Sequence, residues 1–219
     1  MPPGSLTPLQ ERILRCLAGM EPSWTLTGGG ALAGFHTAHR TTRDLDLFWR
    51  ARETLEDLPE RVRERLMADG LAVAASRSAP SFHRLNVTHG DETCLVDLVS
   101  EPAPALAPPD RVRLGDRQIE IDSAHEILVN KLCALLGRAE IRDLFDLEVL
   151  LGRGGDLERA LADAPRQDGG FSPLTLAWVL KGLRVTQLAR SENMDESTIA
   201  RLVTFHGALV RRLIAGSRQ

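Results

Sequence analysis

The segment Asp44-Leu-Asp-Leu-Phe-Trp49 alternates polar and apolar side chains, which is the period of a half-buried β-strand. Residues i and i+2 of a strand point to the same face. Asp44 and Asp46 should therefore lie side by side, while Leu45 and Leu47 face the core. The pattern predicts a sheet with one packed face and one face that carries two neighbouring acids.

Two carboxylates at this spacing repel one another, so something has to neutralise them. A divalent metal does so directly, and Mg²⁺ favours a few carboxylates together with phosphate oxygens. The alternative is the exposed face of an edge strand with two solvated acids. The D-x-D pattern of Asp44 and Asp46 alone leaves both interpretations open.

A glycine loop precedes this strand. The strand pattern Trp24-Thr-Leu-Thr27 is followed by Gly28-Gly29-Gly30 and by helix formers from Ala31 to His39. A strand, a glycine loop and a helix leave backbone N–H groups free to receive phosphate. The loop is not a Walker motif, because no Lys follows, nor a dinucleotide fingerprint, because Ala33 replaces its third Gly. A simple tight turn is the alternative.

The composition is that of an ordinary globular protein. The 219 residues are 43% hydrophobic and 26% charged, which excludes collagen-like, low-complexity and wholly disordered chains. The net charge of -3 means that nucleic acid could bind only through a local basic patch. No run approaches the roughly 18 apolar residues of a membrane helix, and Met1 to Gln10 do not read as a signal peptide. We expect a cytoplasmic protein that does not associate with membranes.

Cysteine and lysine are both sparse. Cys16, Cys94 and Cys133 show no C-x-x-C pair and no metal spacing, so buried free thiols are expected. Only two of the 27 Lys and Arg residues are lysines, Lys131 and Lys181.

The remaining pattern changes from strands to helices near Asp122. Expected helices and hairpins follow in the order Leu9 to Leu17 (helix), Glu53 to Asp69 (helix, ended by Gly70), Phe82 to Val99 (hairpin), Val112 to Ile121 (hairpin), Ser123 to Leu136 (helix) and Arg142 to Leu150 (helix). Further helices follow Gly155. We therefore predict an α+β chain with a core over residues 1–122 and a helical part over residues 123–219 packed on that core.

Two further groups of residues could complete a site. Asp97 lies between apolar neighbours in the middle of a predicted strand, where an acid is disfavoured unless it is solvated or functional. Lys131 and Arg138 are two turns apart on nearly the same helix face and could hold the outer phosphates of a nucleoside triphosphate. The alternative is a solvated face on which Arg142 and Asp146 form an i,i+4 pair.

Four motifs in this order carry a resemblance to a known family. They are Gly28 to Leu32, His39 to Phe48, Val96 to Leu98, and Lys131 to Leu147. From about Thr25 to Leu151 the sequence resembles the AbiEii/AbiGii-type nucleotidyltransferase toxins of the polymerase-β-like superfamily, which include toxins of type IV toxin–antitoxin systems and MenT-like toxins. The resemblance implies a nucleotidyltransferase-like mixed sheet flanked by helices, with a helical C-terminal part.

The resemblance also implies roles for particular acids. Asp44 and Asp46 would be the metal-binding pair, and Asp97 the third strand carboxylate of the superfamily. Lys131 would contact the triphosphate. Asp143 would be the acid that the family carries on the helix after that lysine. These five residues form the expected catalytic set.

The expected nucleotide-binding residues surround this set. They are Thr27, Gly28, Gly29, Gly30, Arg40, Thr42, Lys131 and Arg138. Arg40 matches the family's basic residue before the D-x-D, and Thr42 stands where Ser is common. Many superfamily members have Gly-Ser in the first loop, whose hydroxyl meets a phosphate. This chain has Gly-Gly there, with Thr27 just before it.

The implied reaction is the transfer of a nucleoside monophosphate from an NTP to a hydroxyl acceptor, with release of pyrophosphate. One or two Mg²⁺ ions on Asp44, Asp46 and Asp97 would stabilise the displacement, while Lys131 and Arg138 would neutralise the leaving pyrophosphate. The acceptor would be RNA, such as a tRNA 3′ end, or a protein. A cognate antitoxin would be a partner.

Three other functions stay open. One is a nucleotidyltransferase of small molecules such as antibiotics, and another is a non-catalytic interaction module of the same fold. The third is DNA binding through a helix-turn-helix between Val185 and Leu202, for which an amphipathic packing helix is the alternative.

Overall fold

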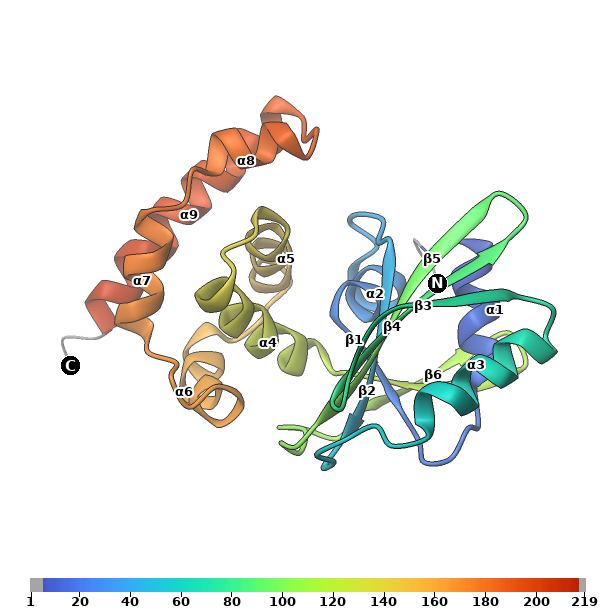
Figure 1. Cartoon of the computed structure of the whole chain (residues 1–219). Helices are drawn as coiled ribbons and strands as arrows, with labels where there is room; N and C mark the ends of the chain where they lie inside the picture. Colours follow the sequence, from blue (N-terminus) through green and yellow to red (C-terminus); the bar gives the residue numbers. More distant parts are fainter. Residues whose placement is uncertain (1–5, 217–219) are drawn as a thin grey trace. The chain divides into compact units, whose positions relative to one another are not determined.

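The computed structural model of the chain describes residues 6–216. The chain divides into two compact units, Met1–Ser123 and Ala124–Gln219. Figure 1 shows that the strands belong to the first unit and that the second consists of helices.

The first unit is built around one sheet of seven strands. In chain order its elements are α1 (Pro8–Leu17), β1 (Thr25–Thr27), α2 (Gly28–Ala31), the π-helical turn η1 (Leu32–Thr37), β2 (Asp44–Arg50), α3 (Leu58–Ala68), β3 (Ala72–Ala79), β4 (Phe82–His89), β5 (Glu92–Glu101), β6 (Asp110–Leu114) and β7 (Arg117–Ile121). The strand order is β3-β4-β5-β2-β1-β7-β6. The sheet is mixed, because β2 runs parallel to β5 and β1 runs parallel to β7, whereas the other neighbours are antiparallel.

The alternation of β2 separates an apolar face from a polar one. Leu45 and Leu47 are fully buried, while Asp44 and Asp46 are half-buried. Helices α1 and α3 pack against each other and against the strands, and Figure 1 shows them together beside the sheet. Burying the apolar faces of these elements is the main favourable contribution to folding. The predicted strand and its two faces are confirmed.

Three elements differ from the sequence prediction. The expected loop of Gly28 to Gly30 forms the short helix α2 instead, with a φ of 60° at Gly28. The helix expected from Glu53 begins only at Leu58, because Glu56 adopts a φ of 52°, which no helix accommodates. Strand β3 was not predicted, since its small residues show no alternation and nearly all of them are exposed. A strand exposed on both faces leaves no hydrophobic period in the sequence.

The second unit is helical. It comprises α4 (Ala124–Gly137), α5 (Ile141–Gly152), α6 (Leu157–Gln167), α7 (Pro173–Lys181), α8 (Val185–Ser191) and α9 (Glu196–Gly216). Helix α4 packs against α5, α6 and α7, and its residues Val129 and Leu132 are fully buried. Between residues 6 and 216, no helix has the length and apolar character needed to cross a bilayer.

Candidate active site

The acids of the sheet lie where two parallel strands meet. Asp46 on β2 is paired in register with Asp97 on β5, and Asp44 lies two residues before Asp46 on the same face. Asp97 is only 5% exposed, whereas Asp44 and Asp46 are half-buried. The register therefore brings three carboxylates onto one side of two neighbouring strands.

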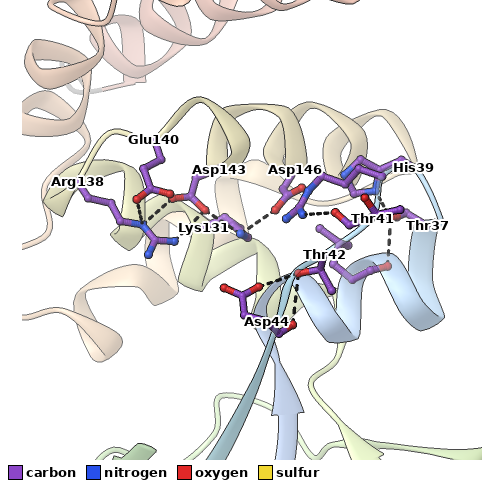
Figure 2. A network of polar contacts seen from close by, with 12 residues as sticks. Thr37, His39, Thr41, Thr42, Asp44, Lys131, Arg138, Glu140, Asp143 and Asp146 are labelled. Atoms are coloured by element: carbon purple, nitrogen blue, oxygen red, sulfur yellow. Dashed lines mark hydrogen bonds and ion pairs between the residues drawn. The ribbon is translucent and has the colours of Figure 1, made fainter. Parts of the chain in front are cut away.

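The segment that leads into β2 is held in place by hydrogen bonds. The hydroxyl of Thr42 donates to Oδ1 of Asp44 at 2.8 Å (Figure 2). The buried amide of Gln10, on α1, donates to the carbonyl oxygen of Thr42 at 3.0 Å. Helix α1 thus fixes the residue that orients the first acid, a link that the sequence did not indicate.

The glycines of α2 approach these acids closely. Gly28 has a φ of 60°, and a Cβ there would lie 2.2 Å from Oδ2 of Asp46. A Cβ on Gly29 would lie 2.8 Å from the hydroxyl of Thr42 and 3.0 Å from Nη2 of Arg40. The first glycine is required by both its backbone conformation and its neighbour. The start of α2 therefore places bare backbone directly beside Asp46 and Thr42.

Thr27 contributes an unusual hydroxyl at this point. It is 3% exposed and is paired across the sheet with Asp46. Its Oγ1 is buried and has no hydrogen-bond partner within residues 6–216. An unsatisfied buried hydroxyl is costly, so one beside carboxylates and a bare glycine loop indicates a place for a polar ligand. The donor set fits Mg²⁺ with phosphate oxygens.

Asp97 is engaged by an arginine. Nε and Nη2 of Arg84, on β4, donate to its two carboxylate oxygens, each at 2.6 Å. The bidentate hydrogen bond raises the pKa of Arg84. Within the described residues, no group of three or more His, Cys, Asp and Glu side chains is arranged to hold a metal ion. Metal binding by Asp44 and Asp46 stays a prediction, and a contribution from Asp97 would require Arg84 to release it.

Lys131 lies in a compact ionic cluster of the second unit. Its Nζ is 2.7 Å from Oδ1 of Asp143 and 2.7 Å from Oδ2 of Asp146, and Figure 2 shows both carboxylates turned toward it from α5. Nε of Arg138 lies 2.9 Å from Oδ2 of Asp143. Burial alone would lower the pKa of Lys131, but the charges of Asp146 and Asp143 outweigh it and the pKa is raised.

Two details of this region differ from the sequence interpretation. The alternative interpretation, a solvated face with an i,i+4 pair between Arg142 and Asp146, is wrong, because Arg142 lies 3.2 Å from Glu192 and Asp146 binds Lys131. Helix α4 ends at Gly137, so Arg138 lies just beyond it rather than on the helix. The expected contact of Lys131 and Arg138 with a triphosphate stays a prediction.

The cysteines are free thiols, as predicted. Cys94 is buried, but Cys16 and Cys133 are only partly so, which corrects the expectation of three buried thiols. Burial raises the pKa of Cys94 to about 12 and that of Cys133 to about 11. Such thiols are poor nucleophiles and poor metal ligands at neutral pH.

The predicted helix-turn-helix segment does form two helices, α8 and α9, joined by a short turn. Two of its arginines are engaged by acids, since Arg190 pairs with Glu196 and Arg201 with Glu148. This acidic setting does not favour contact with a phosphate backbone.

The architecture is similar to that of two solved structures, one of which is a nucleotidyltransferase toxin. MenT4, a nucleotidyltransferase toxin from Mycobacterium tuberculosis, matches with a TM-score of 0.61 at 18% identity, over 94% of this chain and 80% of that one. JHP933 from Helicobacter pylori matches with a TM-score of 0.57 at 22% identity, over 96% and 92% of the two chains. The mixed sheet with flanking helices is thus a nucleotidyltransferase-like fold, as predicted.

The sequence identifies the family within that class. The model of the family described as nucleotidyl transferase AbiEii toxin, type IV TA system, matches residues 12–198. The chain belongs to this family of nucleotidyltransferase toxins, which confirms the predicted resemblance. A comparison with curated proteins gave no significant match.

Proposed function

We propose that this protein transfers a nucleoside monophosphate from an NTP to a hydroxyl acceptor in a Mg²⁺-dependent reaction. The observation that carries the proposal is the joint position of Asp44 and Asp46, the bare backbone of Gly28 and the unsatisfied hydroxyl of Thr27. Carboxylates, a hydroxyl and backbone beside open glycines are the groups that hold a metal-bound polyphosphate.

The residues of the first unit have separable tasks. Asp44 and Asp46 would hold a Mg²⁺ ion, which would supply positive charge to neutralise the phosphates. Thr42 keeps the carboxylate of Asp44 oriented, and Thr27 offers its hydroxyl to a phosphate oxygen in place of the serine of related loops. Positioning and electrostatics supply most of the rate in phosphoryl chemistry.

The roles of the remaining residues follow from charge. Asp97 would accept the proton of the acceptor hydroxyl or help to hold a second ion, and either role would require Arg84 to release it. Lys131 and Arg138 neutralise charge on the leaving pyrophosphate, with Asp143 positioning both cations. The acceptor is a hydroxyl of RNA, such as a tRNA 3′ end, or of a protein. Membership of a toxin family implies a cognate antitoxin as partner.

The test is incubation with each α-³²P-labelled NTP, Mg²⁺ and total cellular RNA. We expect wild type to label the RNA and Asp46→Asn, which preserves side-chain shape, to lose nearly all transfer. Asp91→Asn, on the exposed turn between β4 and β5, is the matched control and should behave as wild type. Full transfer by Asp46→Asn would refute the assignment. Absence of both transfer and NTP–Mg²⁺ binding in wild type would favour a non-catalytic interaction module, and label on a small molecule alone would favour the antibiotic-type reaction.

A further inference from the structure

The polar face of the sheet continues from the carboxylates outward to the edge strand. Asp46 pairs with Asp97, Asp97 pairs with Arg84, and Arg84 pairs with Arg77. These residues form one row across β2, β5, β4 and β3. The row begins with acids in the candidate active site and ends with arginines at the open edge.

The turn of the β3–β4 hairpin brings Arg77 into this row. It pairs Ala79 with Phe82 and Ser78 with His83, and the same register places Arg77 opposite Arg84. Side chains alternate along a strand, so Arg77 shares the face of Arg84. A β-bulge at Ser76 ends this register, because Ala75 pairs with Leu85. The hairpin therefore adds a second arginine to the polar face.

The two arginines flank an aromatic ring. Cζ of Arg77 lies 5.4 Å from the ring centre of Phe82, and Cζ of Arg84 lies 5.7 Å from it. In β2, on the far side of β5, Arg50 lies over Phe48 at 5.5 Å. Phe48 and Phe82 are both paired with Val99 of β5, so they lie in one row beside the row of charged residues.

Arg77 is available for an external ligand. It is exposed on an edge strand and has no ion-pair partner in the described part of the chain, 6–216. Its neighbours in β3 are Ala and Ser, which leave its guanidinium uncovered. A chain with a net charge of -3 needs local positive charge to bind a polyanion, and Arg77 supplies such a charge at the edge of the sheet, since Arg84 is already paired with Asp97.

We propose that the bulged hairpin β3–β4 is the acceptor-binding surface and that it binds a single-stranded polynucleotide. A phosphate of the polynucleotide pairs with Arg77, and one of its bases stacks on Arg77 and Phe82. The end of the polynucleotide then lies along the charged row, in the direction of Asp46. The inference rests on the proposed transferase activity and assigns the surface that receives its nucleic-acid acceptor.

The test measures binding of a short fluorescent single-stranded RNA to the full chain by anisotropy, without NTP. Arg77→Gln and Phe82→Leu should each weaken binding by about fivefold or more. Arg77→Gln should also lower the slope of log Kd against log salt by about 0.7. Arg113→Gln, an exposed arginine on the opposite edge strand β6, is the matched control and should bind as wild type does. Circular dichroism verifies that all variants fold.

Three results would overturn the inference. They are equal binding by Arg77→Gln and Arg113→Gln, equal affinity for blunt duplex RNA, and labelling of a protein acceptor at an unchanged rate by Arg77→Gln. If wild type transfers label to RNA and both hairpin variants do so equally well, the surface is wrong and the transferase stands. If RNA binding depends on Arg77 and wild type transfers label to no acceptor, the binding surface stands and the transferase is wrong.

Discussion

Replacing Lys131 by Met should unfold the second unit at a much lower denaturant concentration. The ammonium group lies 2.7 Å from two carboxylates, those of Asp143 and Asp146, whose side chains are 1% and 0% exposed. Removing one partner of a buried ion pair costs about 3–5 kcal/mol, since the remaining charge is buried without compensation. Arg138, 2.9 Å from Asp143, compensates part of the loss, so we expect about 3 kcal/mol.

The assay is urea unfolding followed by far-ultraviolet circular dichroism. The control is Arg142→Met, which breaks an ion pair with Glu192 whose side chains are 39% and 37% exposed. Pairs at that exposure contribute about 0–1 kcal/mol. Adding Asp146→Asn to the Lys131→Met variant should cost less than Asp146→Asn costs in wild type, since the two groups interact. A loss below about 1 kcal/mol for Lys131→Met would refute the reasoning from burial.

Three further outcomes are expected. Gly28→Ala should lower Tm and transfer activity more than Gly90→Ala. The backbone φ is similar at the two positions, 60° and 58°, but only a Cβ at position 28 would meet Asp46. Equal effects of the two substitutions in thermal unfolding would exclude the clash as the cause. The pKa of Lys131 is raised above 10.5, so its stabilisation is complete below pH 10.5 and is lost as the pH rises through the folded-state pKa. The difference in unfolding free energy between wild type and Lys131→Met should therefore shrink only in that alkaline range. Shrinkage near neutral pH would contradict this prediction. Cys94, with a pKa of about 12, should react with iodoacetamide at pH 8 far more slowly than a free model thiol, and mass spectrometry of the alkylated peptide measures this.

The sequence predicted the parts of the fold that depend on short-range patterns. The alternation around Asp44 and Asp46 and the turn at Gly90 are local, and each formed as expected. The same turn also predicts a contact of Asp97 that the sequence analysis did not include. The turn pairs His89 with Glu92, and this register places Arg84 opposite Asp97. The arginine that binds the third acid could therefore have been identified from the hairpin alone.

Other features depend on contacts that leave no period in the sequence. A bulge adds one residue to β3, and nothing in the run of Ala and Ser marks Ser76 as the extra one. The buried amide of Gln10 reaches Thr42 across 32 residues, a contact fixed by the packing of α1 rather than by any motif. The pairing of Lys131 with both acids was accessible only in part: Asp143 and Asp146 share a helix face at i,i+3, which indicates a common partner.

The departure of the first loop from the usual Gly-Ser has a physical explanation in Thr27. A serine after the glycine would place its hydroxyl on the loop, but here a Cβ at Gly29 would meet Thr42 and Arg40. Thr27 precedes the loop and carries a buried hydroxyl without a partner among residues 6–216. Because an unpaired buried hydroxyl costs stability, its retention is explained if a ligand satisfies it. Thr27→Val, which keeps the shape and removes the hydroxyl, should therefore preserve or raise stability while weakening NTP binding.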